Sequence, residues 1–105
     1  MPIDAAKHFM AKAKEYTNAC DAATHDFYVR YIQGDPKAQQ RSWDADVKQL
    51  TSLIADMEKV AKFWHADLLM AIQSFGGPSD TKIHNAKTLL NTMKHKIEEA
   101  KKAHT

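Results

Sequence analysis

The fold is decided by residues 43–75, WDADVKQLTSLIADMEKVAKFWHADLLMAIQSF, which contain neither glycine nor proline. Apolar residues recur there in alternating steps of three and four, the spacing that keeps one face of a helix apolar. Such a repeat is typical of helices that pack along a coiled-coil-like seam. Its members are Trp43, Val47, Leu50, Ile54, Met57, Ala61, Trp64, Leu68, Ala71 and Phe75. We therefore expect this stretch to be a long helix with one buried side.

The same spacing appears on both sides of this stretch. The earlier run extends from Ile3 to Tyr31 and is less uniform, because Thr17 and Thr24 occupy two of its positions. The later run consists of Ile83, Ala86, Leu90, Met93, Ile97 and Ala100. Three amphipathic helices are therefore predicted, each with one face directed at the other two.

Two short breaks separate the three runs. Residues 34–36 read Gly-Asp-Pro and residues 76–79 read Gly-Gly-Pro-Ser, so glycine ends one helix and an Asp or Ser cap begins the next. Short connections make consecutive helices antiparallel neighbours. The prediction is an all-α, antiparallel up-down-up three-helix bundle with long coiled-coil-like helices at about 3–33, 36–75 and 79–103.

Composition indicates one folded domain over residues 1–105. Hydrophobic residues make up 44% of the chain and charged residues 27%, which argues against disorder. The formal net charge of +2 is too small to indicate a nucleic-acid or membrane partner. The single cysteine, Cys20, excludes an internal disulfide, and its place on the apolar repeat favours a buried thiol.

Nothing in the sequence resembles a membrane span or a signal peptide. The longest purely apolar run, residues 68–72, is far shorter than the roughly 20 residues that cross a bilayer. The start of the chain is charged and amphipathic and lacks the apolar core of a signal peptide. We therefore expect a cytoplasmic protein, although leaderless export is compatible with the same features.

The predicted helices differ in length, and this difference is the best clue to a partner. At 1.5 Å per residue the middle helix would be about 60 Å long, the first about 46 Å and the last about 37 Å. Folded back at the two breaks, the outer helices leave each end of the middle helix with a single neighbour. The later end is strongly apolar, and such a surface usually marks an interface. Its candidate interface residues are Phe63, Leu68, Leu69, Met70, Ile72 and Phe75.

Trp43 is a further candidate for the interface, at the other end of the middle helix. The last helix is expected to reach back only to about Leu50, which would leave Trp43 with fewer neighbours inside the chain. Core packing is the simpler interpretation of Trp43. A bend in the middle helix would likewise turn the apolar residues at its later end into core, so both alternatives stay open.

No catalytic, cofactor or metal site is predicted. Four of the six histidines, His8, His25, His84 and His95, fall on the outward faces of the helices, whereas a metal needs three or four ligands that converge on one point. No acid, base and nucleophile fall together on any predicted face. We therefore expect no enzyme activity.

Two alternative functions remain. A small molecule could bind in a cavity between the helices, near Thr17, Cys20, Thr24, Met57 and Trp64. Nucleic acid is a weaker alternative, because residues 79–105 carry six Lys against three acidic residues but contain no arginine and no aromatic residue to stack on a base.

A non-enzymatic protein-interaction module is the function that the pattern favours most. It would act as an adaptor, a chaperone-like protein or an assembly subunit, as a homodimer or within a hetero-complex. The apolar end of the middle helix would bind a partner helix in the manner of a helix in a groove.

Overall fold

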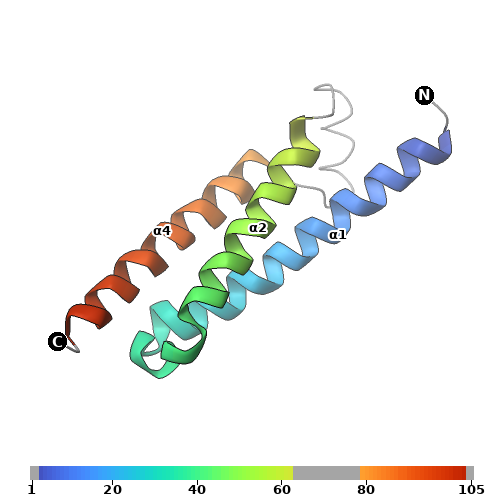
Figure 1. The fold of residues 1–105 in the computed structure, drawn as a ribbon. Helices are drawn as coiled ribbons and strands as arrows, with labels where there is room; N and C mark the ends of the chain where they lie inside the picture. Colours follow the sequence, from blue (N-terminus) through green and yellow to red (C-terminus); the bar gives the residue numbers. More distant parts are fainter. Residues whose placement is uncertain (1–2, 63–78, 104–105) are drawn as a thin grey trace.

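The computed structural model describes residues 3–62 and 79–103, and all of its regular elements in these ranges are helical. The long helices lie side by side, and each runs antiparallel to the next along the chain (Figure 1). This arrangement confirms the predicted all-α three-helix bundle. Its elements are α1 (Ile3–Phe27), the π-helical turn η1 (Tyr28–Gln33), the 3-10 helix η2 (Pro36–Ser42), α2 (Trp43–Lys62) and α4 (Asp80–Ala103).

The first break forms as the local sequence predicts. A Cβ atom at Gly34 would lie 2.7 Å from the carbonyl oxygen of Arg30, so only glycine fits this close approach. The side chain of Asp35 then caps η2 by accepting a hydrogen bond from the backbone N–H of Lys37 at 3.0 Å. Pro36 occupies the first turn of η2, where a missing N–H costs nothing.

The helices next to this break are not α-helical throughout. Residues 28–33 form a wider π-helical turn and residues 36–42 a tighter 3-10 helix, where the sequence predicts α-helix. The indole N–H of Trp43 donates to the carbonyl oxygen of Pro36 at 2.7 Å, which ties the start of η2 to the first residue of α2. This bond spans seven residues, so a pattern of apolar spacing does not reveal it.

The apolar repeat becomes the core. In α4 the repeat is buried from Ala86 to Ala100, with Ile83 half-buried at its start. In α1 the buried position moves from the predicted Thr24 to Ala23, because a helix of 3.6 residues per turn drifts from a seven-residue repeat. The central core, as we call this cluster, contains Cys20, Ala23, Phe27, Tyr31, Trp43, Leu50, Ile54, Met57, Ala86, Leu90, Met93, Ile97 and Ala100.

Two ion pairs show which residues of α1 and α2 lie beside α4. Lys87 lies 3.2 Å from Glu58 of α2, and Lys82 lies 3.0 Å from Asp21 of α1. If the middle and last helices were both straight and met at the second break, Lys87 would lie beside a residue about two helical turns after Glu58 in the sequence. The end of α4 is correspondingly displaced toward the start of α2, where Ile97 lies beside Trp43.

The expectation that the last helix stops near Leu50 is therefore wrong. It assumed that the middle helix runs straight to residue 75. In the structure Lys87 pairs with Glu58, and Ile97 lies beside Trp43, so α4 reaches further along α2 than this assumption gives. The start of α2 is covered by α4, and its apolar residues belong to the central core.

Candidate interaction site

Six of the seven predicted interface residues lie outside the described residues: Phe63, Leu68, Leu69, Met70, Ile72 and Phe75. The seventh, Trp43, is only 6% exposed. Its indole N–H is bonded to Pro36 and its ring belongs to the central core, so within this chain Trp43 serves packing. The described residues nearest to the predicted site are the last turns of α2, which ends at Lys62, and the side chains packed against them.

A small apolar cluster lies beside those turns. Val60 of α2 is 8% exposed and packs with the fully buried Ala13 of α1, and the half-buried side chains of Met10 and Tyr16 pack against this pair. Its members all come from α1 and α2, and Tyr16 packs against both this cluster and the central core. It therefore marks a layer of two described helices rather than three.

The described part of α4 does not extend to this cluster. α4 begins at Asp80, and Lys82 pairs with Asp21, so the described part of α4 runs beside α1 only from about Asp21 onward. Eighteen residues of α1 precede that level, from Ile3, which corresponds to about 27 Å of helix. In Figure 1 this part of α1 extends beyond the start of α4.

The opposite end of α2 holds a buried polar cluster, which we call the polar junction. Asp46 is 6% exposed, and its Oδ2 atom accepts a hydrogen bond from the Tyr31 hydroxyl at 2.6 Å. The same oxygen lies 3.0 Å from the Ser42 hydroxyl and 3.5 Å from Nη1 of Arg30. Arg30 also pairs with Asp26 at 3.1 Å. The polar junction therefore connects η1, the end of η2 and α2 around one carboxylate.

The electrostatics of the polar junction point to a structural role. Burial and the hydrogen bond to Asp46 raise the pKa of Tyr31 above its usual value, so the hydroxyl stays protonated and remains a donor. The Ser42 hydroxyl is also 3.2 Å from the carbonyl oxygen of Gln39, so its single proton serves one acceptor at a time.

The sequence interpretation missed the polar junction. It assigned no role to Asp46. One signal was present: Tyr31 lies on the apolar repeat, and a buried tyrosine hydroxyl normally requires a hydrogen-bond partner. The identity of that partner, fifteen residues away, follows only from the folding back of the chain.

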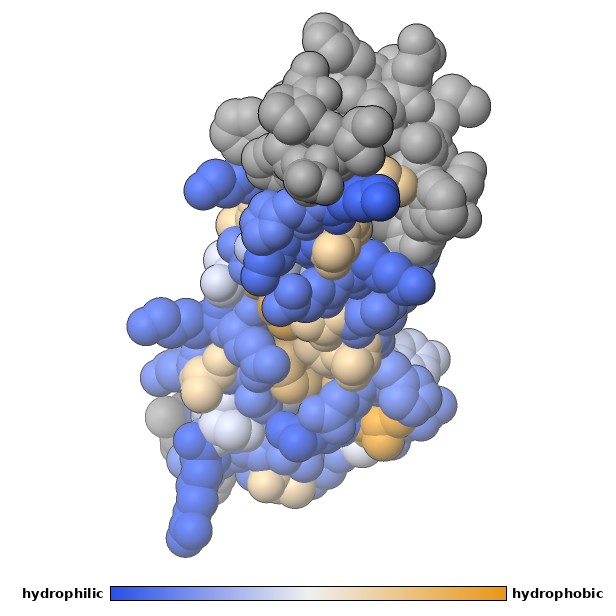
Figure 2. Space-filling model, turned by 90° about the vertical axis from the view of Figure 1, so that its right-hand side faces the viewer, coloured by the Kyte–Doolittle hydropathy of each residue, from blue (hydrophilic) through white to orange (hydrophobic). Residues whose placement is uncertain are grey.

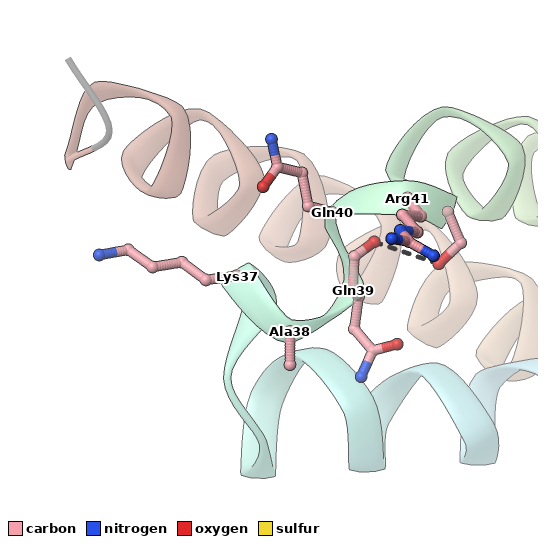
Figure 3. Close-up of a pocket in the computed structure, with 6 residues that line it drawn as sticks. Lys37, Ala38, Gln39, Gln40 and Arg41 are labelled. Carbon is pink, nitrogen blue, oxygen red and sulfur yellow. Dashed lines mark hydrogen bonds between the residues drawn. The ribbon is translucent and has the colours of Figure 1, made fainter.

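A surface hollow lies along η2 and is lined by residues 37–42 (Figure 3). Figure 3 shows the side chains of Lys37, Gln39 and Gln40 pointing in different directions rather than toward a common point. All six lining residues are consecutive, and none of them is buried. The hollow is therefore an open surface of the turn, without the converging polar groups of a ligand site.

Four of the five residues assigned to the predicted small-molecule cavity lie within the described residues: Thr17, Cys20, Thr24 and Met57. Thr17 is fully buried and its hydroxyl donates to the carbonyl oxygen of Ala13 at 2.8 Å, while Thr24 donates to that of Asp21. Cys20 is 2% exposed, and burial raises the pKa of its thiol to about 11, with a further contribution from the charge of Asp21. These side chains are committed to packing or to their own helix, and Trp64, also assigned to the cavity, lies outside the described residues.

The described surface is mainly hydrophilic. Figure 2 shows one face on which charged and polar residues surround a few scattered apolar ones. The large apolar side chains that stand out are Tyr28 and Val29 of η1, which are 46% and 44% exposed. His8, His25, His84 and His95 are all exposed, and the described residues include no group of three metal-ligating side chains.

Comparisons with known proteins give no further guide: no family model, no curated protein and no solved structure matches this chain. Among the described helices none has the length and apolar character needed to cross a membrane.

Proposed function

We propose that this protein is a non-enzymatic helical interaction module. Its partner surface is formed by the apolar residues that follow α2, with Leu68, Leu69, Met70, Ile72 and Phe75 as the main anchors and Phe63 beside them. The interaction is burial of a partner helix against this surface.

One observation supports the proposal most directly: among the described helices, only α1 and α2 contribute to the apolar cluster at this end. Val60 and Ala13 form a layer from α1 and α2 alone among the described helices, because α4 starts only at the level of Asp21. A partner helix packed on the anchors would give this end a helical neighbour of the kind that α4 gives to the rest of α2. The anchors follow α2 directly in the sequence, so the end of α2 leads to them.

The first partner we propose is a second copy of this chain. Most homo-oligomers are built on two-fold symmetry, in which the same surface serves both subunits. An apolar helix face satisfies this requirement because it is complementary to itself. A helix of another protein would use the same anchors in a hetero-complex.

The test is the mass of the protein in solution, measured by light scattering during size exclusion over a range of concentrations. The unmodified chain should show a mass above the 11.9 kDa of one copy, and the mass should rise with concentration. The double variant Leu69→Glu with Met70→Glu should remain at the mass of one copy, because buried glutamates would lose their hydration. Its helix content, measured by circular dichroism, should be unchanged.

A matched control places the same two charges elsewhere. Tyr28→Glu with Val29→Glu alters two exposed apolar residues of η1, at the other end of the bundle from Val60. This control should associate as the unmodified chain does. Association of the Leu69/Met70 variant would show that the assigned surface is wrong, and a single-copy mass of the unmodified chain at every concentration would exclude self-association.

A further inference from the structure

A second surface of the molecule has the features of a docking site. A groove of about 230 Å³ lies between the first turns of α2 and the last turns of α4, which run side by side in Figure 1. Its apolar lining, which we call the floor, consists of Trp43, Val47 and Ile97. Lys48 of α2 lines one bank, and Lys94 and Lys101 of α4 line the other. We call it the lysine groove. It lies at the opposite end of α2 from Lys62 and is independent of the surface proposed above.

The charges along the lysine groove are unbalanced. Asp44 and Glu98 also line it, so three ammonium groups face two carboxylates, a net charge of +1. Glu98 is 3.4 Å from Lys101 on the same helix and offsets its charge. Lys48 and Lys94 form no ion pair with any carboxylate of the described chain. Two cations from different helices are therefore available to an anionic partner.

The dimensions of the groove favour a helix over a small molecule. Pockets that bury a whole ligand usually measure about 300–1,000 Å³, which exceeds the volume between these two helices. A volume of about 230 Å³ is enough for one apolar side chain inserted from a passing helix. A channel between two packed helices is also the usual seat of a third.

Nucleic acid fits the lysine groove less well. A phosphate backbone would approach Asp44 and Glu98 as closely as the lysines. Bases would need an exposed aromatic face, and Trp43 is only 6% exposed. The apolar floor would remain without a use.

We propose that the lysine groove binds an acidic amphipathic helix of another protein. One apolar side chain of that helix packs against the half-buried Val47, and its carboxylates lie against the lysines on both banks. Lys94 and Lys101 are seven residues apart, which is two helical turns or about 10.5 Å. A partner helix with acidic residues at i−3 and i+4 from its apolar anchor presents its carboxylates at the same spacing.

The test uses a synthetic helical peptide with that pattern: an alanine-rich sequence with one Leu and with Glu at i−3 and i+4 from it. Binding of the fluorescently labelled peptide to the full chain is measured by anisotropy at low ionic strength. The variant Lys48→Gln with Lys94→Gln should bind about tenfold more weakly, because it loses two ion pairs with the carboxylates of the peptide.

Two controls separate this site from general charge attraction. Lys14→Gln with Lys96→Gln removes the same charge outside the groove, and it should leave the affinity within about twofold of the unmodified chain. A peptide with Ala in place of the Leu should bind more weakly, because the floor loses its apolar contact.

Three results would overturn the proposal. The first is equal weakening by both pairs of lysine variants, and the second is equal binding of the Leu and Ala peptides. The third is tighter binding of random single-stranded DNA than of the peptide, which would make the groove a nucleic-acid surface.

Discussion

The central core and the polar junction stabilise the same bundle in different ways. The central core joins α1, α2 and α4 through apolar side chains, and most of its members follow one repeat along the chain. The polar junction joins η1, η2 and α2 through one buried carboxylate, Asp46, and its three neighbours Tyr31, Ser42 and Arg30. Apolar contacts carry no direction, so the core admits many registers, whereas the hydrogen bonds of the junction fit only one. The central core therefore supplies most of the stability, and the polar junction fixes how the chain reverses direction between α1 and α2.

The largest effect should come from the core. Leu50→Ala removes a fully buried side chain and should lower the free energy of unfolding by about 2–5 kcal/mol, measured by urea denaturation. Gln49→Ala, on the exposed side of the same turn, should change it by less than about 0.5 kcal/mol. A similar cost for both substitutions would contradict the assignment of the core.

The polar junction should respond next. Asp46→Ala leaves the Tyr31 hydroxyl buried without its acceptor and should cost about 1–3 kcal/mol in urea denaturation. Tyr31→Phe removes the donor, and the double variant should cost less than the sum of the two single changes because both act on one bond. Simple additivity would show that the hydrogen bond has no net effect on stability.

Alkaline pH should weaken the bundle through its buried acids. Burial raises the pKa of Cys20 from 9.0 to about 11, so the folded state holds this proton more tightly than the unfolded state. The resulting stability is complete below pH 9 and is lost as the pH rises toward 11. At pH 10 the loss should be about 1 kcal/mol. Tyr31, whose pKa is also raised, should add to the loss at higher pH.

Cys20→Ala is the variant that tests this pH dependence. Its free energy of unfolding should fall less steeply between pH 9 and 10 than that of the unmodified chain, because the ionising thiol is absent. Equal slopes in the two proteins would mean that the thiol ionises as readily in the folded state as in the unfolded state.

The smallest effect should come from the surface ion pair that links α4 to α1. Lys82→Gln breaks the exposed contact with Asp21 and should cost about 0.2–1 kcal/mol, less at high salt because the pair is screened. The measurement is urea denaturation at two ionic strengths. A loss comparable to that of Leu50→Ala would mean that this contact, and not the core, holds α4 in place.

The sequence predicts those features that depend on local spacing. The buried positions Leu90, Met93 and Ile97 of α4 follow from the repeat, and the break at Gly34 and Asp35 follows from residue types that act within a few positions. Both were predicted, because neither needs knowledge of the rest of the fold.

The missed features join distant residues. Asp46 becomes the acceptor for Tyr31 only after the chain turns back on itself, and the register of α4, seen in its contacts with Glu58 and Asp21, depends on the packing of all three helices. Trp43 was expected to be less covered because that register was assumed to follow from straight helices. Of the candidate site, the described residues contain only Trp43 and the cluster around Ala13 and Val60, so the role of its other anchors stays a prediction.

The central claim, that the residues after α2 bind a partner helix, is tested most directly by hydrogen–deuterium exchange at increasing protein concentration. If two copies associate through this surface, amide exchange should slow with concentration in peptides that cover residues 63–75. Exchange should stay constant in peptides from η1 and η2. Slowing that occurs only outside residues 63–75, or no change while the solution mass rises, would contradict the account.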